Sequence, residues 1–422
     1  MLITNAEIVD LGAGRSELTS LRISDGRVTT VGPVRAGAGE PVLDAKGCAV
    51  LPGLHDHHMH LLSYAASLES VHCGPPAVQT ETDLAETLRA DSGSGWLRGY
   101  GYHESVAGDI DRAWLDQVVE DRPVRVQHRS GRLWVLNAAA LRTLRALADV
   151  NGNSGIAIDL PPDGRLYDRD QMLGDLLGRT LPPVGRASRR LAGFGVTGLT
   201  DMTPSNDTAT MELFRALRRN GTLLQTVQVA GSPALDDSAA DGVTSAATKI
   251  HLHESGLPPF EQLRELIRNS HARRRPVAVH CVTEVELVFA LGAIEEAGSR
   301  AGDRIEHASV TPPPLLDKLR ELGLLVVTQP NFIAERGDAY LDDIASDEWS
   351  WLYRARSFIH RGIPFAVGTD APFGGADPWI AIRAAVDRTT AGGRVLGPAE
   401  SLSPEAAVAL FVGSPDEPDR PR

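Results

Sequence analysis

The chain has 422 residues, and its 42% hydrophobic and 23% charged residues are typical of a globular protein. The formal net charge of −13 argues against nucleic acid and anionic membrane surfaces as partners. No segment approaches the roughly 20 apolar residues of a membrane span, and residues 1–7 lack the pattern of a secretion signal. The cysteines, Cys48, Cys73 and Cys281, are scattered without the spacing of a metal site. We therefore expect a cytoplasmic protein with no nucleic-acid or membrane partner.

Residues 1–52 predict a small β-module. Apolar segments of strand type occur at residues 2–3, 7–9, 21–23, 28–31 and 42–44. Asp25-Gly26 separates two of these segments, and this dipeptide between apolar alternations indicates a β-hairpin.

A histidine-rich strand follows the module. Residues 54–60 read Leu-His-Asp-His-His-Met-His and hold four of the chain's 13 histidines. Alternate residues of a strand share a face, so we expect His58 and His60 to point the same way and Met59 to point away. Two such imidazoles can bind a transition metal. Asp56 lies on their side, where it could orient a ligand or touch the metal. A histidine-rich surface loop is the alternative.

From residue 195 onward, strand-like apolar runs alternate with helical patterns. The runs lie at residues 195–202, 223–230, 246–253, 276–281, 303–308, 324–329 and 364–370. Helical periodicity marks residues 260–272, 284–297 and 313–322. With the histidine strand the count is eight, which favours a (β/α)8 TIM-type barrel over residues 53–412 and makes a doubly wound sheet the weaker alternative.

The first two predicted barrel strands are separated by more chain than the roughly 30 residues of a βα unit. We therefore predict a β-rich insertion at residues 91–175, with strand-like segments at residues 124–128, 133–135 and 155–160. An insertion after the first strand would cover the barrel mouth and bring at least one side chain to the pocket. Residues 413–422 form a polar tail.

Metal-binding residue types occur at the ends of five predicted strands, where barrels carry their catalytic groups. They are His58, His60, Lys249, His280, His307 and Asp370. Each alone is ordinary; Asp370, for example, could be a helix N-cap. Only three of the 42 Lys and Arg residues are lysine, so Lys249 is a notable choice, although an ion pair with an acid such as Glu254 is an alternative role for it.

This ordered set resembles the amidohydrolase superfamily of metal-dependent (β/α)8-barrel hydrolases. Residues 52–60 are similar to its Pro-Gly-hydrophobic-x-Asp-x-His-x-His signature, and residues 195–197 to its second-strand motif. Residues 303–307 with 326–330, and residues 131–137, resemble the branch that contains N-substituted formamide deformylases. In the last motif Arg132 replaces the histidine usual in that branch, so the family role of that position is not carried over.

The resemblance implies one or two divalent metal ions, expected to be zinc. By this resemblance His58 and His60 bind the more buried ion, and His280 and His307 bind the other. Lys249, carboxylated by carbon dioxide, would bridge the two.

The resemblance also implies the catalytic and substrate-binding residues. Asp370 would hold the shared water, take its proton as general base and pass it to the leaving amine. Residues 248–251 are similar to the lysine motif of ureases, where the nearby histidine, here His251, helps to hold the substrate. Gln329 and Asn331 follow the seventh strand and are expected to contact the substrate.

Three functions stay open. The first is hydrolysis of an amide-type C–N bond, in an N-formyl, N-acyl or cyclic amide. The second is deamination of an aromatic or heterocyclic amine at one metal on His58, His60, His280 and Asp370, a reaction that does not need Lys249. Glu284 follows His280 by four residues, where deaminases of this superfamily often place an acid. The third is a barrel that has lost its metal.

Family habit favours a homodimer and a small-molecule substrate. Family members usually return after the barrel to complete the N-terminal β-module. This chain stops at residues 416–422, soon after a predicted helix at residues 404–410, so we expect either a reduced module or a shortened chain.

Overall fold

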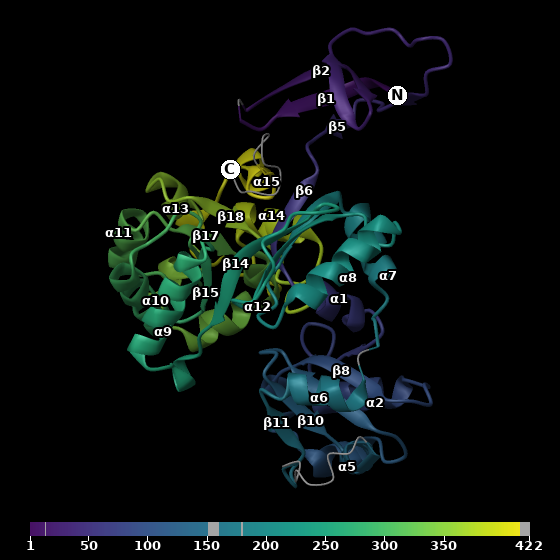
Figure 1. Ribbon diagram of the computed structural model, residues 1–422, viewed down its shortest axis with the longest axis vertical. Coiled ribbons are helices and arrows are strands. Elements are labelled where there is room, and N and C mark those ends of the chain that lie inside the picture. Colours follow the sequence, from purple (N-terminus) through teal and green to yellow (C-terminus); the bar gives the residue numbers. More distant parts are fainter. Residues whose placement is uncertain (13, 151–159, 179, 414–422) are drawn as a thin grey trace.

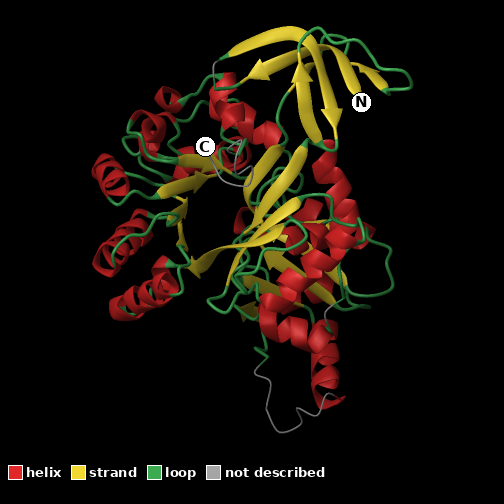
Figure 2. Cartoon of the chain, turned by 45° about the horizontal axis from the view of Figure 1, so that its top comes forward, coloured by secondary structure: helices red, strands yellow, loops and turns green. Residues whose placement is uncertain are grey.

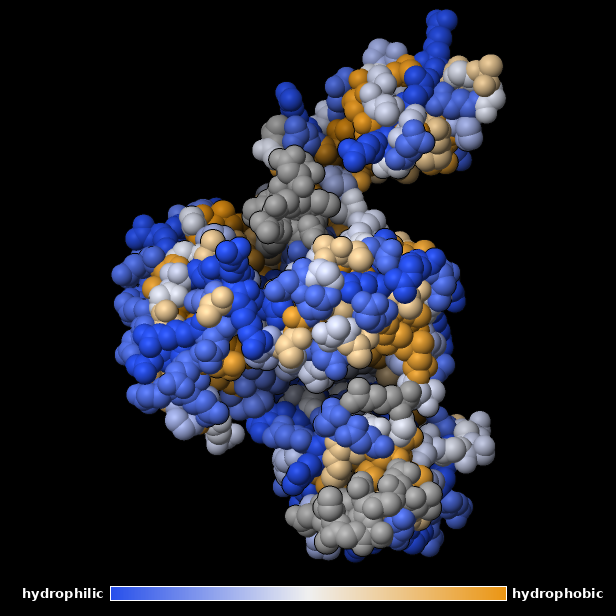
Figure 3. Space-filling model, viewed as in Figure 1, coloured by the Kyte–Doolittle hydropathy of each residue, from blue (hydrophilic) through white to orange (hydrophobic). Residues whose placement is uncertain are grey.

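A computed structural model describes residues 1–12, 14–150, 160–178 and 180–413. Figure 1 shows three bodies in a row: the N-terminal sheet at the top, the barrel in the centre and the insertion at the bottom. The space-filling view in Figure 3 shows the same three masses. Among the helices that the structure describes, none combines the length and apolar character needed to cross a membrane.

The N-terminal module is a sheet of five strands. Its order is β3-β2-β1-β4, with β5 also pairing with β1. The strands are β1 (Leu2–Asp10), β2 (Arg15–Ser24), β3 (Arg27–Val31), β4 (Val42–Asp44) and β5 (Ala49–Val50). The predicted hairpin joins β2 and β3, and Asp25 (φ 52°) and Gly26 (φ 73°) both adopt the positive φ that tight hairpin turns require.

The centre of the molecule is an eight-stranded parallel barrel, as predicted. Its order is β18-β17-β16-β15-β14-β13-β12-β6. The strands are β6 (Leu54–Met59), β12 (Val196–Asp201), β13 (Thr226–Gly231), β14 (Val243–His251), β15 (Val277–Cys281), β16 (Arg304–His307), β17 (Leu325–Thr328) and β18 (Phe365–Val367).

The seam between β18 and β6 is closed by backbone outside the strands. At one end, the N–H of His55 donates to the carbonyl of Phe411 (2.6 Å), and the N–H of Val367 donates to that of Leu410 (3.3 Å). At the other end, the N–H of Asp370 donates to the carbonyl of His58 (2.7 Å). The last bond holds two candidate site residues beside each other.

Helices surround the barrel strands (Figure 2). They are α1 (Leu61–Ser67), α7 (Val184–Gly193), α8 (Thr208–Arg219), α9 (Phe260–Ala272), α10 (Glu284–Ala297), α11 (Pro313–Glu321), α12 (Asn331–Asp343), α13 (Arg356–His360), α14 (Pro378–Asp387) and α15 (Pro404–Ala409). The predicted bounds of α9 and α10 agree with the structure. A capping box at Thr283 and Glu286 marks the start of α10. Buried aliphatic side chains from both layers form the main core.

The insertion is built on a second five-stranded sheet, of order β11-β10-β9-β8-β7. Its strands are β7 (Val71–His72), β8 (Leu97–Tyr102), β9 (Val124–His128), β10 (Leu133–Leu136) and β11 (Arg165–Tyr167). Its helices are α2 (Glu81–Ala90), α3 (Glu104–Ala107), α4 (Arg112–Val118), α5 (Ala138–Val150) and α6 (Asp170–Leu177).

This sheet starts well before the predicted boundary at residue 91, because β7 has only two residues and gives no periodic signal. Trp134 is buried in the insertion, and its indole N–H donates to Oδ1 of Asp170 (2.9 Å). Of the strand predicted at residues 155–160, residues 155–159 lie outside the described residues.

The insertion faces the ends of the strands that carry the candidate site. In Figure 1, β6 descends from the N-terminal module and ends above the insertion. A side-chain carbon added at Gly131 of the insertion would lie 2.9 Å from the ring of Phe373, which follows β18. The insertion therefore packs against the barrel mouth.

Candidate active site

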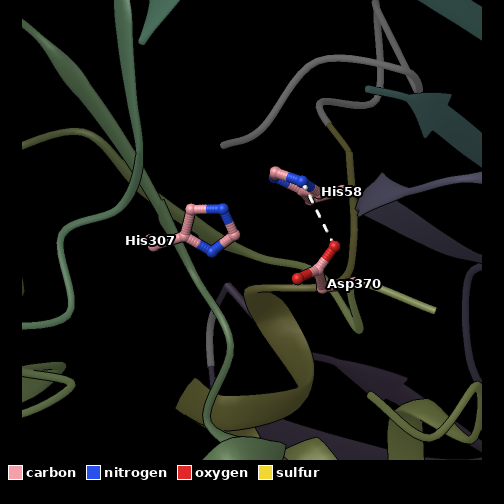
Figure 4. Close-up of side chains that lie close together, drawn as sticks. All are labelled: His58, His307 and Asp370. Carbon is pink, nitrogen blue, oxygen red and sulfur yellow. Dashed lines mark ion pairs between the residues drawn. The ribbon is translucent and has the colours of Figure 1, made fainter. Parts of the chain in front are cut away.

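Three buried side chains converge at the carboxyl ends of the barrel strands. His58 is the last residue but one of β6, His307 ends β16 and Asp370 follows β18. One potential ligand atom of each lies within 4.8 Å of those of the other two. Figure 4 shows the three side chains grouped at this point, with Nε2 of His58 3.5 Å from Oδ1 of Asp370.

His60 joins this group, as strand alternation predicted. Its Nε2 atom lies 3.2 Å from Oδ1 of Asp370, so His58 and His60 face the same carboxylate oxygen. Its Nδ1 atom is hydrogen-bonded to Oγ1 of Thr203 (3.0 Å). Burial opposes ionisation of Asp370, but the contact with His60 and the nearby imidazoles outweigh it and lower the pKa of the carboxyl.

A β-bulge interrupts the alternation between Asp56 and Met59. Asp56 pairs with Leu199 and Met59 with Asp201, so β6 has one residue more than β12 in this interval. The sequence analysis did not predict this bulge. Even so, the rings of His55 and His57 lie 4.5 Å apart between centroids, as residues i and i+2 of a strand can, and His58 and His60 both face Asp370.

Asp56 has a different role from the two that we considered. Its carboxylate accepts hydrogen bonds from the N–H groups of His58 (3.1 Å) and Thr369 (3.0 Å) and from the Thr369 hydroxyl (2.5 Å). Through these bonds Asp56 holds the backbone next to His58 and Asp370. It does not orient the ring of a candidate metal ligand.

Left-handed backbone helps to direct two of the candidate ligands. His307 has φ 68° and Asp370 has φ 57°, values uncommon for residues other than glycine. In β16 the neighbouring side chains of Glu306 and His307 both reach His58. Glu306 is hydrogen-bonded to His58, and the ring centroids of His307 and His58 lie 4.8 Å apart. A regular strand would send them to opposite faces.

Glu306 is a site residue that the sequence analysis missed. Its Oε2 atom lies 2.5 Å from Nδ1 of His58, and Arg304 donates to both of its oxygens. Burial opposes its ionisation, but Arg304 and His58 outweigh burial and hold the pKa of Glu306 well below its ordinary value. An ionised Glu306 accepts the Nδ1 proton of His58 and leaves Nε2 free for a metal. The sequence signal that could have identified Glu306 is the presence of two charged residues, Arg304 and Glu306, in a buried strand.

Gln329 and Asn331, which we expect to contact the substrate, are fully buried beside the candidate ligands and also make supporting contacts there. Oε1 of Gln329 lies 2.7 Å from Nδ1 of His307. This contact orients His307 as Glu306 orients His58. Nδ2 of Asn331 donates to the carbonyl of Thr369 (3.0 Å), next to Asp370.

Lys249, on β14, has a buried amine. Its side chain is 7% exposed, and Nζ has no hydrogen-bond partner among the described residues. Burial lowers the pKa of Lys249 to about 8, although the carboxylates of Glu306 and Asp370 raise it. The alternative ion pair with Glu254 is absent from the described part of the chain.

The remaining predicted histidines extend the cluster. The ring of His280 lies 4.4 Å from that of His307 and 4.2 Å from that of His251, which is exposed at the mouth. Burial lowers the pKa of His58 to about 3 and that of His307 to about 4, so both imidazoles are neutral, the form that binds metal.

These residues fit a divalent metal. They offer neutral imidazole nitrogens and a carboxylate, a donor set that suits zinc. The unpartnered Nζ of Lys249 beside them is a buried polar group that a further bond would satisfy. Glu284, the acid that the deaminase alternative would use, is exposed in the first turn of α10.

The sequence profile of the amidohydrolase family matches residues 41–415. The chain belongs to the amidohydrolase family. It is therefore a metal-dependent hydrolase that acts on carbon–nitrogen bonds.

Individual relatives agree with this assignment. The chain is 23% identical over 490 residues to the N-substituted formamide deformylase of Arthrobacter pascens, covering 98% of this chain and 88% of the relative. It is also 23% identical over 442 residues to YtcJ of Bacillus subtilis (strain 168), covering 88% and 80%. Among solved structures, an uncharacterized metal-dependent hydrolase from Pyrococcus horikoshii OT3 matches with a TM-score of 0.75 and 22% identity, covering 97% and 91% of the two chains.

Proposed function

We propose that this amidohydrolase cleaves an amide-type C–N bond of a small molecule, in an N-formyl, N-acyl or cyclic amide. The observation that carries the proposal is the convergence of His58, His307 and Asp370 within 4.8 Å, beside the unpartnered amine of Lys249. The resemblance to an N-substituted formamide deformylase supports the choice of an amide bond.

We assign the metal ligands as follows. His58, His60 and Asp370 would hold one zinc ion, and His280 and His307 would hold a second. Lys249, carboxylated on its amine, would join the two, which accounts for a lysine that is buried without a partner. When bound, such ions act as Lewis acids that polarise a carbonyl and lower the pKa of water.

The protein's own groups move the proton. The Asp370 carboxylate would take a proton from the attacking water and deliver it to the nitrogen of the leaving amine, because it lies at the mouth between His58 and His60. Asp56 and Asn331 hold the backbone next to Asp370. Glu306 and Gln329 fix the rings of His58 and His307. These supports keep the proton acceptor in place through the reaction.

Metal content of Lys249→Ala tests the two-metal site. We expect close to two metal ions per chain in the wild type and in the surface control Lys318→Ala, and about one in Lys249→Ala. Short carboxylic acids added to Lys249→Ala should restore part of the second metal ion. Loaded wild type should hydrolyse members of a panel of N-formyl, N-acyl and cyclic amides. One metal in all three proteins, with release of ammonia from aromatic amines, would replace the proposal by a mononuclear deaminase.

The wider setting is also a proposal. We expect a cytoplasmic enzyme that acts as a homodimer and has no nucleic-acid or membrane partner. Size measurement of the purified chain tests the dimer.

A further inference from the structure

A cavity of about 330 Å³ lies between the insertion and the barrel mouth. The insertion contributes side chains from β8 and β9, and the barrel contributes α12 and the loop after β18. Phe373 of that loop lines the cavity and packs edge-on against His60, with 5.2 Å between ring centroids. The cavity therefore adjoins the candidate metal ligands.

The charged groups lining this cavity have a positive excess. They are Arg98, Arg129, Arg336 and Glu335. Arg98 is engaged within the insertion, because it donates to Ser70 (2.7 Å) and lies over the ring of Trp134. Glu335 is engaged within the barrel, where it accepts the N–H of Gly375 (2.8 Å). Arg129 and Arg336 are thus the groups to consider for a ligand.

Arg129 follows β9, and its guanidinium has neither a hydrogen bond nor an ion pair within the described ranges of the chain. It is half-buried, and burial lowers its pKa, with a further lowering by the charge of Arg336. The insertion's Glu104, whose charge acts on Arg129, is already paired with His128 (2.9 Å) and His103 (3.4 Å).

Arg336, on α12, faces Arg129 from the barrel side. It donates to the carbonyl of Phe373 and stacks on the ring of Phe332, at 4.0 Å from the centroid. No carboxylate forms an ion pair with it in the described part of the chain, but the charges of nearby groups, Glu335 and Asp370 among them, outweigh burial and raise its pKa. Arg129, by contrast, is a half-buried guanidinium beside both the cavity and Arg336, and an anion between the two would offset its burial and their repulsion.

We infer that this cavity binds a carboxylate on the substrate, held by Arg129 and Arg336. The inference rests on the proposed function and narrows it: the substrate is an amide that carries a carboxylate, such as an N-acyl or N-formyl amino acid. Guanidinium groups pair with carboxylates in a planar, two-bond geometry that suits this role. Arg129 is then a specificity-determining residue contributed by the insertion.

Arg129→Gln tests the inference, and Arg142→Gln is the matched control because Arg142 is exposed on α5, at the far end of the insertion (Figure 1). The substrates are N-formyl-leucine and N-acetyl-leucine, each compared with its leucinamide. In metal-loaded enzyme we expect kcat/KM for the acids to fall about 10- to 100-fold in Arg129→Gln, the range for loss of a charged hydrogen bond. The amides, and all substrates with Arg142→Gln, should change little.

Calorimetric binding of 4-phenylbutyrate, 4-phenylbutyramide and phenylphosphonate gives a readout that does not need turnover. We expect the butyrate to bind more tightly than the amide and to lose this advantage in Arg129→Gln. Tighter binding of the phosphonate than of the butyrate would overturn the choice of a carboxylate.

The two proposals fail in distinguishable ways. Equal hydrolysis of acids and amides, unchanged in Arg129→Gln, overturns the inference and leaves the amidase proposal standing. Binding of the butyrate that depends on Arg129, without hydrolysis of any amide by loaded wild type, supports the carboxylate site and overturns the amidase proposal.

Discussion

The Nδ1 atom of His58 lies 2.5 Å from Oε2 of Glu306, and both side chains are buried in the barrel. Glu306 thereby sets the tautomer of His58, and Arg304 keeps Glu306 ionised. This pair links strands β6 and β16, which are separated by most of the barrel sequence. Its consequence is that Nε2 of His58, facing Asp370, carries the lone pair that a metal requires.

Glu306→Gln should weaken metal binding by about 10- to 100-fold, the usual cost of losing a carboxylate behind a histidine ligand. Metal titration of the apoprotein measures the effect. Glu400→Gln is the control, because Glu400 is a buried acid that pairs with Arg354 (3.3 Å). Equal metal affinity in the two variants would contradict the assigned role of Glu306.

His58→Ala or His60→Ala should remove bound metal and activity while the barrel stays folded, because each deletes an imidazole that faces Asp370. Metal analysis with circular dichroism measures both properties. His55→Gln is the control, since His55 is buried in the same strand but bonds to Thr200 (2.9 Å). Full metal content in both alanine variants would refute the assignment of these ligands.

Asp370→Asn should keep most of the metal and lower kcat by about 10²- to 10⁴-fold, because the amide cannot accept the proton. Asparagine tolerates the left-handed backbone at this position (φ 57°), so the variant should fold. Asp303→Asn, at a buried carboxylate bonded to the N–H of Val277 (2.9 Å), controls for general destabilisation. A normal kcat would make Asp370 a structural residue.

Gly131→Ala should lower kcat/KM by about 10- to 100-fold, because displaced groups near a reaction centre carry costs of this order. The added carbon would lie 2.9 Å from Phe373, which packs on His60. Gly108→Ala carries a similar backbone cost, since the φ values are 76° and 67°, but its added carbon meets no atom within 4 Å. Equal loss of activity in both variants would show that the contact with Phe373 has no role.

The sequence alone determined the barrel and the identity of the metal-binding residue types. Hydrophobic periodicity is local, so α9 and α10 could be predicted to the residue, and the strands of the barrel in their correct order. The signature at residues 52–60 placed His58 and His60 on a strand end. Fixed order along the barrel then brought His307 and Asp370 to the same face, because the ends of parallel strands meet there.

Only the tertiary structure decided how these residues are held. The contact of His58 with Glu306 spans 248 positions, and that of Asp56 with Thr369 spans 313. No local pattern encodes such pairs, and none indicated the bulge in β6 or the left-handed backbone at His307. The positions of Gln329, Lys249 and Arg129 likewise depend on which elements pack together. Local sequence fixes periodicity and residue type, whereas partners at long range are fixed by packing.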